Sequence, residues 1–150
     1  MRVFPLLLAL GAAGFGQALG SWEMTAASSS FPEGPRPEKL TVRIESHSRG
    51  EVFTVDTLRR DGRATSSSTI LYLDGMPREL RDFDCSGTQS SRKVDSQTVE
   101  ILRTCGHGES ARWVGRVSTD SKELVLEITE HHSDGRKGNT RIVMVRQDTH

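Results

Sequence analysis

The chain has 150 residues, and its 20 Lys and Arg balance its 20 Asp and Glu, so the formal net charge at pH 7 is zero. Nucleic-acid and acidic-membrane partners call for a surplus of basic residues, and the charge balance therefore argues against both classes. The length predicts one domain. Apolar residues make up 34% of the chain but are concentrated at its start. The apolar content of the remainder is low for a two-layer globule, and it is closer to what the single inward-facing shell of a barrel needs.

The first 18 residues have the pattern of a secretory signal peptide. Arg2 supplies a positive charge, residues 3–15 are apolar, and Gly16-Gln17-Ala18 fits the small-x-small rule for cleavage after Ala18. A second cut, after Gly20, fits the same rule. The apolar run is shorter than the roughly 20 residues that a membrane-spanning helix needs. We therefore expect residues 1–18 to be a signal peptide and residues 19–150 to form one exported domain without a membrane anchor.

The rest of the chain alternates apolar and polar residues with the period of β-strands. Asp-Gly pairs at 61–62, 74–75 and 134–135 are typical of tight hairpin turns. No window after residue 20 has a convincing helical period. We expect an all-β protein, an antiparallel up-and-down meander of about 8–10 strands. Its clearest strand segments are residues 40–45, 52–58, 66–73, 88–94, 98–104, 111–117, 124–129 and 141–146.

Two irregular stretches interrupt this pattern. Residues 31–37 hold three of the five prolines and cannot form a central strand, so we expect a crossing segment or lid between the first and second strands. Residues 131–139 are polar and contain glycine, which predicts a long exposed hairpin tip.

Cys85 and Cys105 are the only cysteines, and an exported protein meets conditions that permit disulfides. Residues 94–99 are expected to form the turn between two strands, which places both cysteines near the open end of one hairpin whose register needs a bulge. A zinc site or a catalytic thiol is the alternative. Zinc would need two further ligands, and His107 alone is near in sequence. We expect a disulfide and no metal.

The start of the expected domain resembles a known family. Gly20-Ser21-Trp22 is a Gly-x-Trp sequence, the first-strand motif of lipocalins. The longer run 20–35 is similar to the opening of small exported bacterial lipocalin-like proteins of the calycin type. The resemblance covers most of residues 19–150 and implies that the meander closes into a lipocalin-like barrel. Closure would also remove the exposed edge strands of a long meander.

The resemblance implies roles for particular residues. Gly20 and Trp22 would close the bottom of the barrel, with an arginine of the last strand lying across the indole ring as a cation–π clasp. Arg141 and Arg146 are both candidates for that arginine. A β-sandwich in which Trp22 is an ordinary core aromatic is the alternative.

Alternation along the strands indicates which side chains point inward. A barrel of about eight strands is either filled by these side chains or holds one small ligand. Tyr72 and Trp113 are suited to a cavity because their polar tips can meet a ligand or water. The alternative is that all of these residues form a plain core. The inward-facing candidates for ligand binding are Trp22, Val42, Ile44, Tyr72, Ile101, Trp113, Leu126 and Ile128.

The sequence contains no recognisable catalytic or metal-binding motif. Neither a His-Glu-x-x-His pattern, a Gly-x-Ser-x-Gly elbow nor a phosphate-binding loop is present. Charged strand residues such as Arg103, Arg112 and Glu127 are expected on a solvated outer face. We expect a monomeric, non-enzymatic binding protein for a small hydrophobic ligand, without a cofactor. A structural or protein-interaction domain with a filled core is the alternative function.

Overall fold

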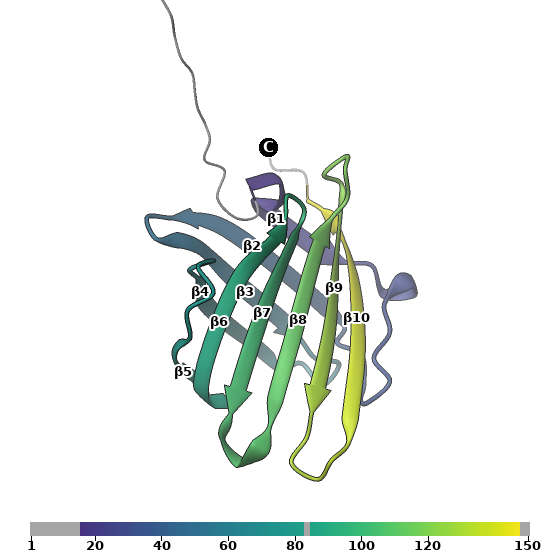
Figure 1. Cartoon of the computed structure of the whole chain (residues 1–150). Helices are drawn as coiled ribbons and strands as arrows, with labels where there is room; N and C mark the ends of the chain where they lie inside the picture. The colour runs from purple at the N-terminus through teal and green to yellow at the C-terminus, as the bar shows by residue number, and fades with distance from the viewer. Residues whose placement is uncertain (1–15, 83–84, 148–150) are drawn as a thin grey trace, which may run out of the picture.

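The computed structural model of the chain describes residues 16–82 and 85–147. These residues form one ten-stranded antiparallel sheet, in the order β4-β3-β2-β1-β10-β9-β8-β7-β6-β5, that curves into a nearly closed barrel (Figure 1). The expected all-β meander and its barrel shape are confirmed. The strands are β1 Gly20–Met24, β2 Lys39–His47, β3 Gly50–Leu58, β4 Ala64–Leu71, β5 Arg78–Asp82, β6 Cys85–Asp95, β7 Thr98–Cys105, β8 Ser110–Val117, β9 Glu123–His131 and β10 Lys137–Arg146.

Two of the three Asp-Gly pairs form the hairpin turns expected of them. Gly62 joins β3 to β4 and Gly135 joins β9 to β10, both with φ of +90°, a backbone conformation that favours glycine. The pair at 74–75 lies instead in the link from β4 to β5, which are not paired strands. This link folds onto β6, where the Gly75 amide donates to the Ser91 carbonyl at 2.8 Å. The third pair is therefore a turn without a hairpin.

The strands with clear apolar alternation bury one face, as predicted. In β2, the inward residues Leu40, Val42 and Ile44 are between 0% and 6% exposed. Leu124 and Leu126 of β9 are equally buried on the opposite wall. Each large apolar side chain removed from water stabilises the fold by about 1.5–3 kcal/mol. A single inward shell of such residues forms the core of the barrel.

Trp22 closes one end of this core. Its side chain is fully buried, its indole Nε1 donates to the Ala18 carbonyl at 2.8 Å, and the Arg146 guanidinium carbon lies 4.3 Å from the ring centroid. Arg146 also donates from NH1 to the Leu19 carbonyl at 2.6 Å and from NH2 to the Gln17 carbonyl. We call the contacts of Trp22 and Arg146 with residues 17–19 the clasp.

The two arginines of the last strand have different places. Arg146 pairs with Trp22 across β1 and β10, whereas Arg141 is exposed and lies 3.8 Å from Glu127. Residues 1–15, the greater part of the expected signal peptide, lie outside the described residues. Gly16–Ala18 form a short 3₁₀ turn against the barrel, so the last residues before the expected cleavage site take part in the clasp.

Residues 31–37 run between β1 and β2 as the expected crossing segment, and we call them the strap. Just before it, Ser30 pairs with Arg141 of β10 through backbone hydrogen bonds. Glu33 then reaches the β9–β10 hairpin, where its Oε1 lies 3.1 Å from His132 Nε2. A Cβ at Gly138 would lie 1.9 Å from the same oxygen, so a side chain there would displace the carboxylate end of Glu33. The strap is therefore anchored to β10 and to the hairpin beyond β9.

The expected disulfide between Cys85 and Cys105 is present, with 5.1 Å between the two Cα atoms. It joins the start of β6 to the end of β7, the open end of a hairpin. The register of this hairpin shifts between Lys93 and Asp95, which agrees with the expected need for a bulge and gives its position. A loop of 20 residues closed in this way stabilises the fold by about 3 kcal/mol in the chain-entropy model.

Candidate binding site inside the barrel

A cavity of about 300 Å³ lies inside the barrel, and we call it the barrel cavity. Its walls come from strands on both sides of the barrel and from the strap, which contributes Phe31. The closed end with Trp22 lies outside its lining. The lining residues are Phe31, Leu40, Phe53, Val55, Thr57, Arg59, Thr65, Ser67, Thr69, Asp82, Ile101, Arg103, Trp113, Ile128, Thr140 and Ile142.

One wall of the barrel cavity is apolar and holds a pair of aromatic rings. Phe53 of β3 and Trp113 of β8 meet edge to face, with 6.2 Å between centroids and 87° between planes. Such a geometry is favourable beyond the area that the rings bury. Leu40, Ile128 and Ile142 extend this wall, and each is at most 8% exposed. The apolar wall offers a ligand a continuous hydrophobic contact surface.

Another part of the lining is polar and includes a charged pair. Arg103 of β7 donates from Nε to the Gln89 side-chain oxygen at 2.8 Å, and its NH1 lies 3.6 Å from Asp82 Oδ2. Ser67 of β4 donates to the same aspartate oxygen at 3.1 Å. Gln89 in turn donates from Nε2 to Thr69 Oγ1 at 2.9 Å. These side chains connect β4 to β5, β6 and β7.

Arg103 also faces the apolar wall. Its guanidinium carbon lies 5.8 Å from the centroid of the Trp113 ring, within the range of a cation–π contact, and its side chain is only 16% exposed. The sequence predicts Arg103 on the solvated outer face, and the structure differs. Val99, Ile101 and Arg103 occupy alternate positions of β7, so the period that turns Ile101 inward also turns Arg103 inward. The alternation along β7 is therefore the sequence signal that could have placed Arg103 inside the barrel.

The candidate ligand-binding residues fall into three places. Ile101, Trp113 and Ile128 line the barrel cavity. Tyr72, the residue after β4, lines a second pocket and not the barrel cavity. The other four belong to the packed core outside the lining of the cavity; they are Trp22, Val42, Ile44 and Leu126. Phe53, Thr69, Asp82 and Arg103 are among the other lining residues, and they were not among the candidates.

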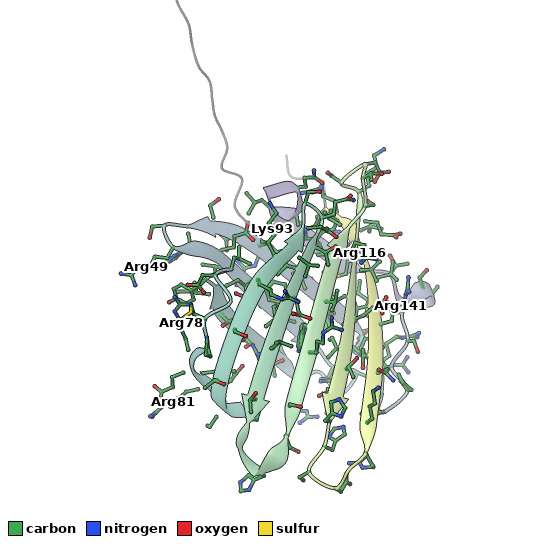
Figure 2. All side chains as sticks on the ribbon, viewed as in Figure 1. Arg49, Arg78, Arg81, Lys93, Arg116 and Arg141 are labelled. Carbon is green, nitrogen blue, oxygen red and sulfur yellow. A yellow bond between two sulfur atoms is a disulfide. The ribbon has the colours of Figure 1, made fainter. Side chains whose placement is uncertain are left out.

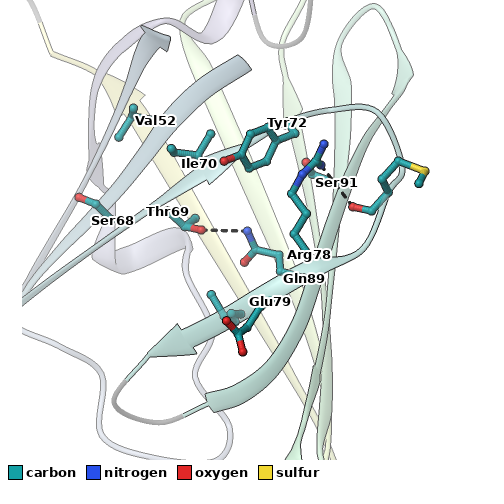
Figure 3. A pocket seen from close by; sticks show the side chains of 11 residues that line it. Val52, Ser68, Thr69, Ile70, Tyr72, Arg78, Glu79, Gln89 and Ser91 are labelled. Carbon is teal, nitrogen blue, oxygen red and sulfur yellow. Dashed lines mark hydrogen bonds between the residues drawn. The ribbon is translucent and has the colours of Figure 1, made fainter. Parts of the chain in front are cut away.

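A second pocket of about 320 Å³, the gap pocket, includes the hydrogen-bonded Thr69 and Gln89 in its lining (Figure 3). Figure 3 shows Thr69 and Ile70 approaching from β4, Gln89 and Ser91 from β6, and Arg78 stacked beside Tyr72. The Arg78 guanidinium carbon is 3.8 Å from the Tyr72 centroid. Thr69 also lines the barrel cavity, so the two pockets meet at this residue of β4, at the edge of the sheet where β4 and β5 are not hydrogen-bonded neighbours.

Arg78 also holds the link between β4 and β5. Its two terminal nitrogens donate to the two carboxylate oxygens of Asp74, at 2.9 and 2.7 Å. These bonds, with one from the Met76 amide, hold the pKa of Asp74 well below its ordinary value of 3.8. The link stays close to β6 through a bond from the Leu73 amide to Ser91 Oγ at 2.9 Å.

Charged side chains such as the labelled Arg49, Arg81 and Arg141 project from the ribbon (Figure 2). Arg112 and Glu127 are exposed on the outer face, as expected. Glu100 of β7 is 5% exposed on this face and accepts from Arg92 at 2.8 Å and from Arg112 at 2.5 Å. The hydrogen bond from Arg92 is the leading cause of the lowered pKa of this glutamate. Arg112 therefore has a carboxylate partner outside the barrel, as Arg103 has one inside.

Residues 16–82 and 85–147 contain no cluster of three or more His, Cys, Asp or Glu side chains placed to hold a metal ion. The same described ranges include no helix that is both long and apolar enough to span a membrane.

No protein-family model and no curated protein matches the sequence. Solved structures share the fold. The zebrafish ileal bile acid-binding protein, crystallised with cholic acid, has a TM-score of 0.56 at 14% identity, over 88% of this chain and 100% of that one. Lipid binding protein 8 of Caenorhabditis elegans has a TM-score of 0.60 at 8% identity, over 91% of this chain and 100% of that one. At these identities the likeness shows the fold alone, a calycin-type barrel.

Proposed function

We propose that this chain is a non-enzymatic binding protein that holds one small hydrophobic molecule in the barrel cavity. The observation that carries the proposal is the cavity itself, about 300 Å³ with an apolar wall of Phe53, Trp113 and Ile128. Ligand pockets occupy roughly 300–1,000 Å³, so the ligand is small. The two similar structures support the proposal, because one binds cholic acid and the other is named a lipid binding protein.

We further propose that the protein is exported, like the small bacterial lipocalin-like proteins that its opening resembles. The disulfide between Cys85 and Cys105 supports an oxidising compartment. Protein recovered from the exported fraction and alkylated without reductant should show no added mass, whereas alkylation after reduction should label two thiols. Labelling of both thiols without reductant would contradict the bridge, and N-terminal sequencing of the same sample would locate the cleavage site.

Binding can be tested with an uncharged fluorescent probe, N-phenyl-1-naphthylamine, and a pair of neighbouring variants. The wild-type protein should give a saturable rise in probe fluorescence. Ile101→Trp places a larger side chain in the barrel cavity and should abolish this rise. Leu102→Trp makes the same kind of change on the outer face, where Leu102 is 42% exposed, and should leave it unchanged.

The outcomes of this titration separate the two candidate functions. Loss of binding in Ile101→Trp alone supports a ligand inside the barrel. No saturable signal with the wild type would favour the alternative of a structural domain that binds no ligand. If circular dichroism shows that Ile101→Trp does not fold, Ile142→Phe adds volume to the same cavity more gently and takes its place.

A further inference from the structure

A row of apolar side chains crosses the outer face of β7, β8, β9 and β10, which lie side by side on the wall that faces the viewer in Figure 1. Each of these residues lies two positions from the strand partner of the one before it, always toward the same end of the barrel. The four side chains therefore form one diagonal, about 25 Å long, which we call the stripe. Its residues are Leu102, Val114, Val125 and Val145.

The stripe is accessible to solvent along its length. Leu102 at one end is 42% exposed and Val145 at the other is 44% exposed, and they are two of the four large apolar side chains exposed in the described part of the chain. Val114 and Val125 lie between them and line a groove of about 540 Å³. Single exposed apolar side chains are common, whereas a contiguous row of them is typical of a contact surface.

Opposite charges face each other across the stripe. On one side, Arg112 is the strand partner of Leu102, and Glu127 is the strand partner of Val114. On the other side, Glu100 pairs with Val114 and Arg116 pairs with Val125. Arg112 thus lies across the stripe from Glu100, and Glu127 lies across it from Arg116. The order of the charges on one side is the reverse of the order on the other.

Arg116 and Glu127 are the two charges best placed to meet a partner (Figure 2 labels Arg116). Arg116 donates from Nε to a neutral acceptor, Thr98 Oγ1, at 3.2 Å, and the described residues place no carboxylate in ion-pair contact with it. Glu127 lies 3.8 Å from Arg141, and the two side chains are 65% and 52% exposed. Such exposed pairs contribute little free energy, so Glu127 can adopt a closer partner at small cost.

A second copy of the chain matches this pattern. Identical surfaces that meet about a two-fold axis have to be self-complementary. An axis along the stripe would lay one stripe on the other and exchange the two sides. Arg116 and Glu127 lie on opposite sides within about 3 Å of the same point along the stripe, so each would meet the other residue of the second copy.

The charge balance of this face also favours a second copy over a strongly acidic or basic partner. Three arginines and two glutamates line the groove, and Glu100, bonded to Arg112, adds a third carboxylate beside it. A partner with a large net charge would meet repulsive groups as well as attractive ones. A copy of the same face offers an equal number of each sign.

We propose that two copies of this chain associate through the outer face of β7 to β10, with stripe against stripe and Arg116 of each copy paired with Glu127 of the other. The proposal departs from the monomer expected from the sequence. It is independent of the molecule in the barrel cavity, because the side chains of the stripe lie on the opposite face of the strands from the cavity lining.

Sedimentation equilibrium of the purified chain tests the charge pairing. The wild type should show a reversible monomer–dimer equilibrium with a micromolar dissociation constant. Arg116→Glu and Glu127→Arg should each weaken it about tenfold, because each change turns two attractive contacts into repulsive ones. An equimolar mixture of the two variants should associate again, since both contacts of the mixed dimer then join opposite charges. A chain that carries both changes should recover association for the same reason.

Matched variants elsewhere on the surface separate this face from general effects. Arg49→Glu reverses an exposed arginine between β2 and β3 and should leave association unchanged. Val125→Asp places a charge in the middle of the stripe and should weaken association about a hundredfold. Val94→Asp makes the same change at a valine that is 48% exposed outside the stripe and should have no effect.

A wild type that stays monomeric at about 1 mM would overturn the proposal. A dimer that Arg116→Glu, Glu127→Arg and Val125→Asp all leave intact would place self-association on another face and would equally overturn it. Failure of the two charge variants to associate with each other would show that these residues do not pair between copies. If circular dichroism shows that a charge variant does not fold, the comparison of Val125→Asp with Val94→Asp decides.

Discussion

The barrel is joined at two seams that are built in different ways. At the β1–β10 seam, backbone ladder contacts pair Trp22 with Arg146 and Met24 with Met144, and the clasp adds side-chain contacts. At the β4–β5 seam, the strands are not hydrogen-bonded neighbours. There, Ser67 and Thr69 of β4 reach Asp82 of β5 and Gln89 of β6 through side chains.

This difference assigns separate tasks to the two seams. The β1–β10 seam borders a fully buried core around Trp22, so it contributes stability. Ser67, Thr69 and Asp82 of the β4–β5 seam line the barrel cavity, so its contacts are also part of the candidate site. Segments held by few backbone bonds open at low free-energy cost, and binding sites commonly include them. We therefore expect stability and ligand exchange to depend on different seams.

The largest expected effect is at the β1–β10 seam. Trp22→Ala removes a fully buried indole, its bond to the Ala18 carbonyl and its contact with Arg146. We expect the free energy of unfolding to fall by about 4 kcal/mol in urea denaturation. Trp113→Ala is the control, because Trp113 is only partly buried beside the cavity, and it should cost about half as much. Equal losses for the two variants would remove the distinction between the closed end and the cavity.

The second prediction concerns where the mature chain begins. A chain starting at Leu19 lacks the carbonyls of Gln17 and Ala18, which accept from Arg146 and Trp22. Compared with a chain starting at Gly16, it should lose about 2 kcal/mol of unfolding free energy. Urea denaturation of the two purified chains provides the comparison. Equal stability would mean that the clasp does not depend on residues 16–18, and that cleavage after Ala18 leaves the β1–β10 seam intact.

The strands with regular alternation could be predicted from sequence because burial dictates their pattern. Leu40, Val42 and Ile44 face one side of β2 for that reason. Two of the Asp-Gly pairs likewise marked the β3–β4 and β9–β10 hairpins. β5, Arg78–Asp82, was missed because it is a short strand of mostly charged residues paired on one side only. Its position depends on pairing with β6, which is information that local sequence does not contain.

The candidate site was harder to predict than the fold. Ile101 and Ile128 were assigned to the interior by alternation, but alternation does not tell which inward residues surround a space and which pack tightly. Val42 and Ile44 have the same pattern and lie in the packed core. Arg103 was assigned to the outer face by its charge, although its strand position pointed inward. Cavities arise from packing between distant strands, and charge alone does not place a residue outside.

A smaller effect is expected at the β4–β5 seam. Thr69→Val keeps the shape of the side chain but removes the acceptor of the Gln89 amide. The free energy of unfolding should fall by about 1 kcal/mol, and hydrogen exchange of β4 amides should accelerate relative to those of β9. Thr65→Val alters a cavity-lining threonine of the same strand outside the Thr69–Gln89 contact and serves as the control. Uniform acceleration across all strands would show that the two seams open together.

The smallest expected effect is on how the stability of the link between β4 and β5, beside the same seam, depends on pH. Arg78 holds the pKa of Asp74 below its ordinary 3.8, so the carboxylate is stabilised more in the folded than in the unfolded chain. A lowered pKa contributes stability that is fully present above pH 3.8 and is lost as the pH falls through the folded-state pKa. Asp74→Asn should remove this part of the acid dependence while leaving the fold intact at neutral pH.

This acid effect distinguishes the seams because Asp74 belongs to the link that packs on β6, far along the sheet order from β1 and β10. Hydrogen exchange measured above and below pH 3.8 should therefore show acid-dependent opening in β4 and β5 of the wild type, reduced in Asp74→Asn. Asp134→Asn is the matched control, since Asp134 accepts from Arg136 in a similar turn within the β9–β10 hairpin. If both variants changed hydrogen exchange at the β4–β5 seam equally, the change would reflect the loss of a surface charge in general, and the Asp74–Arg78 pair would not be a specific support of that seam.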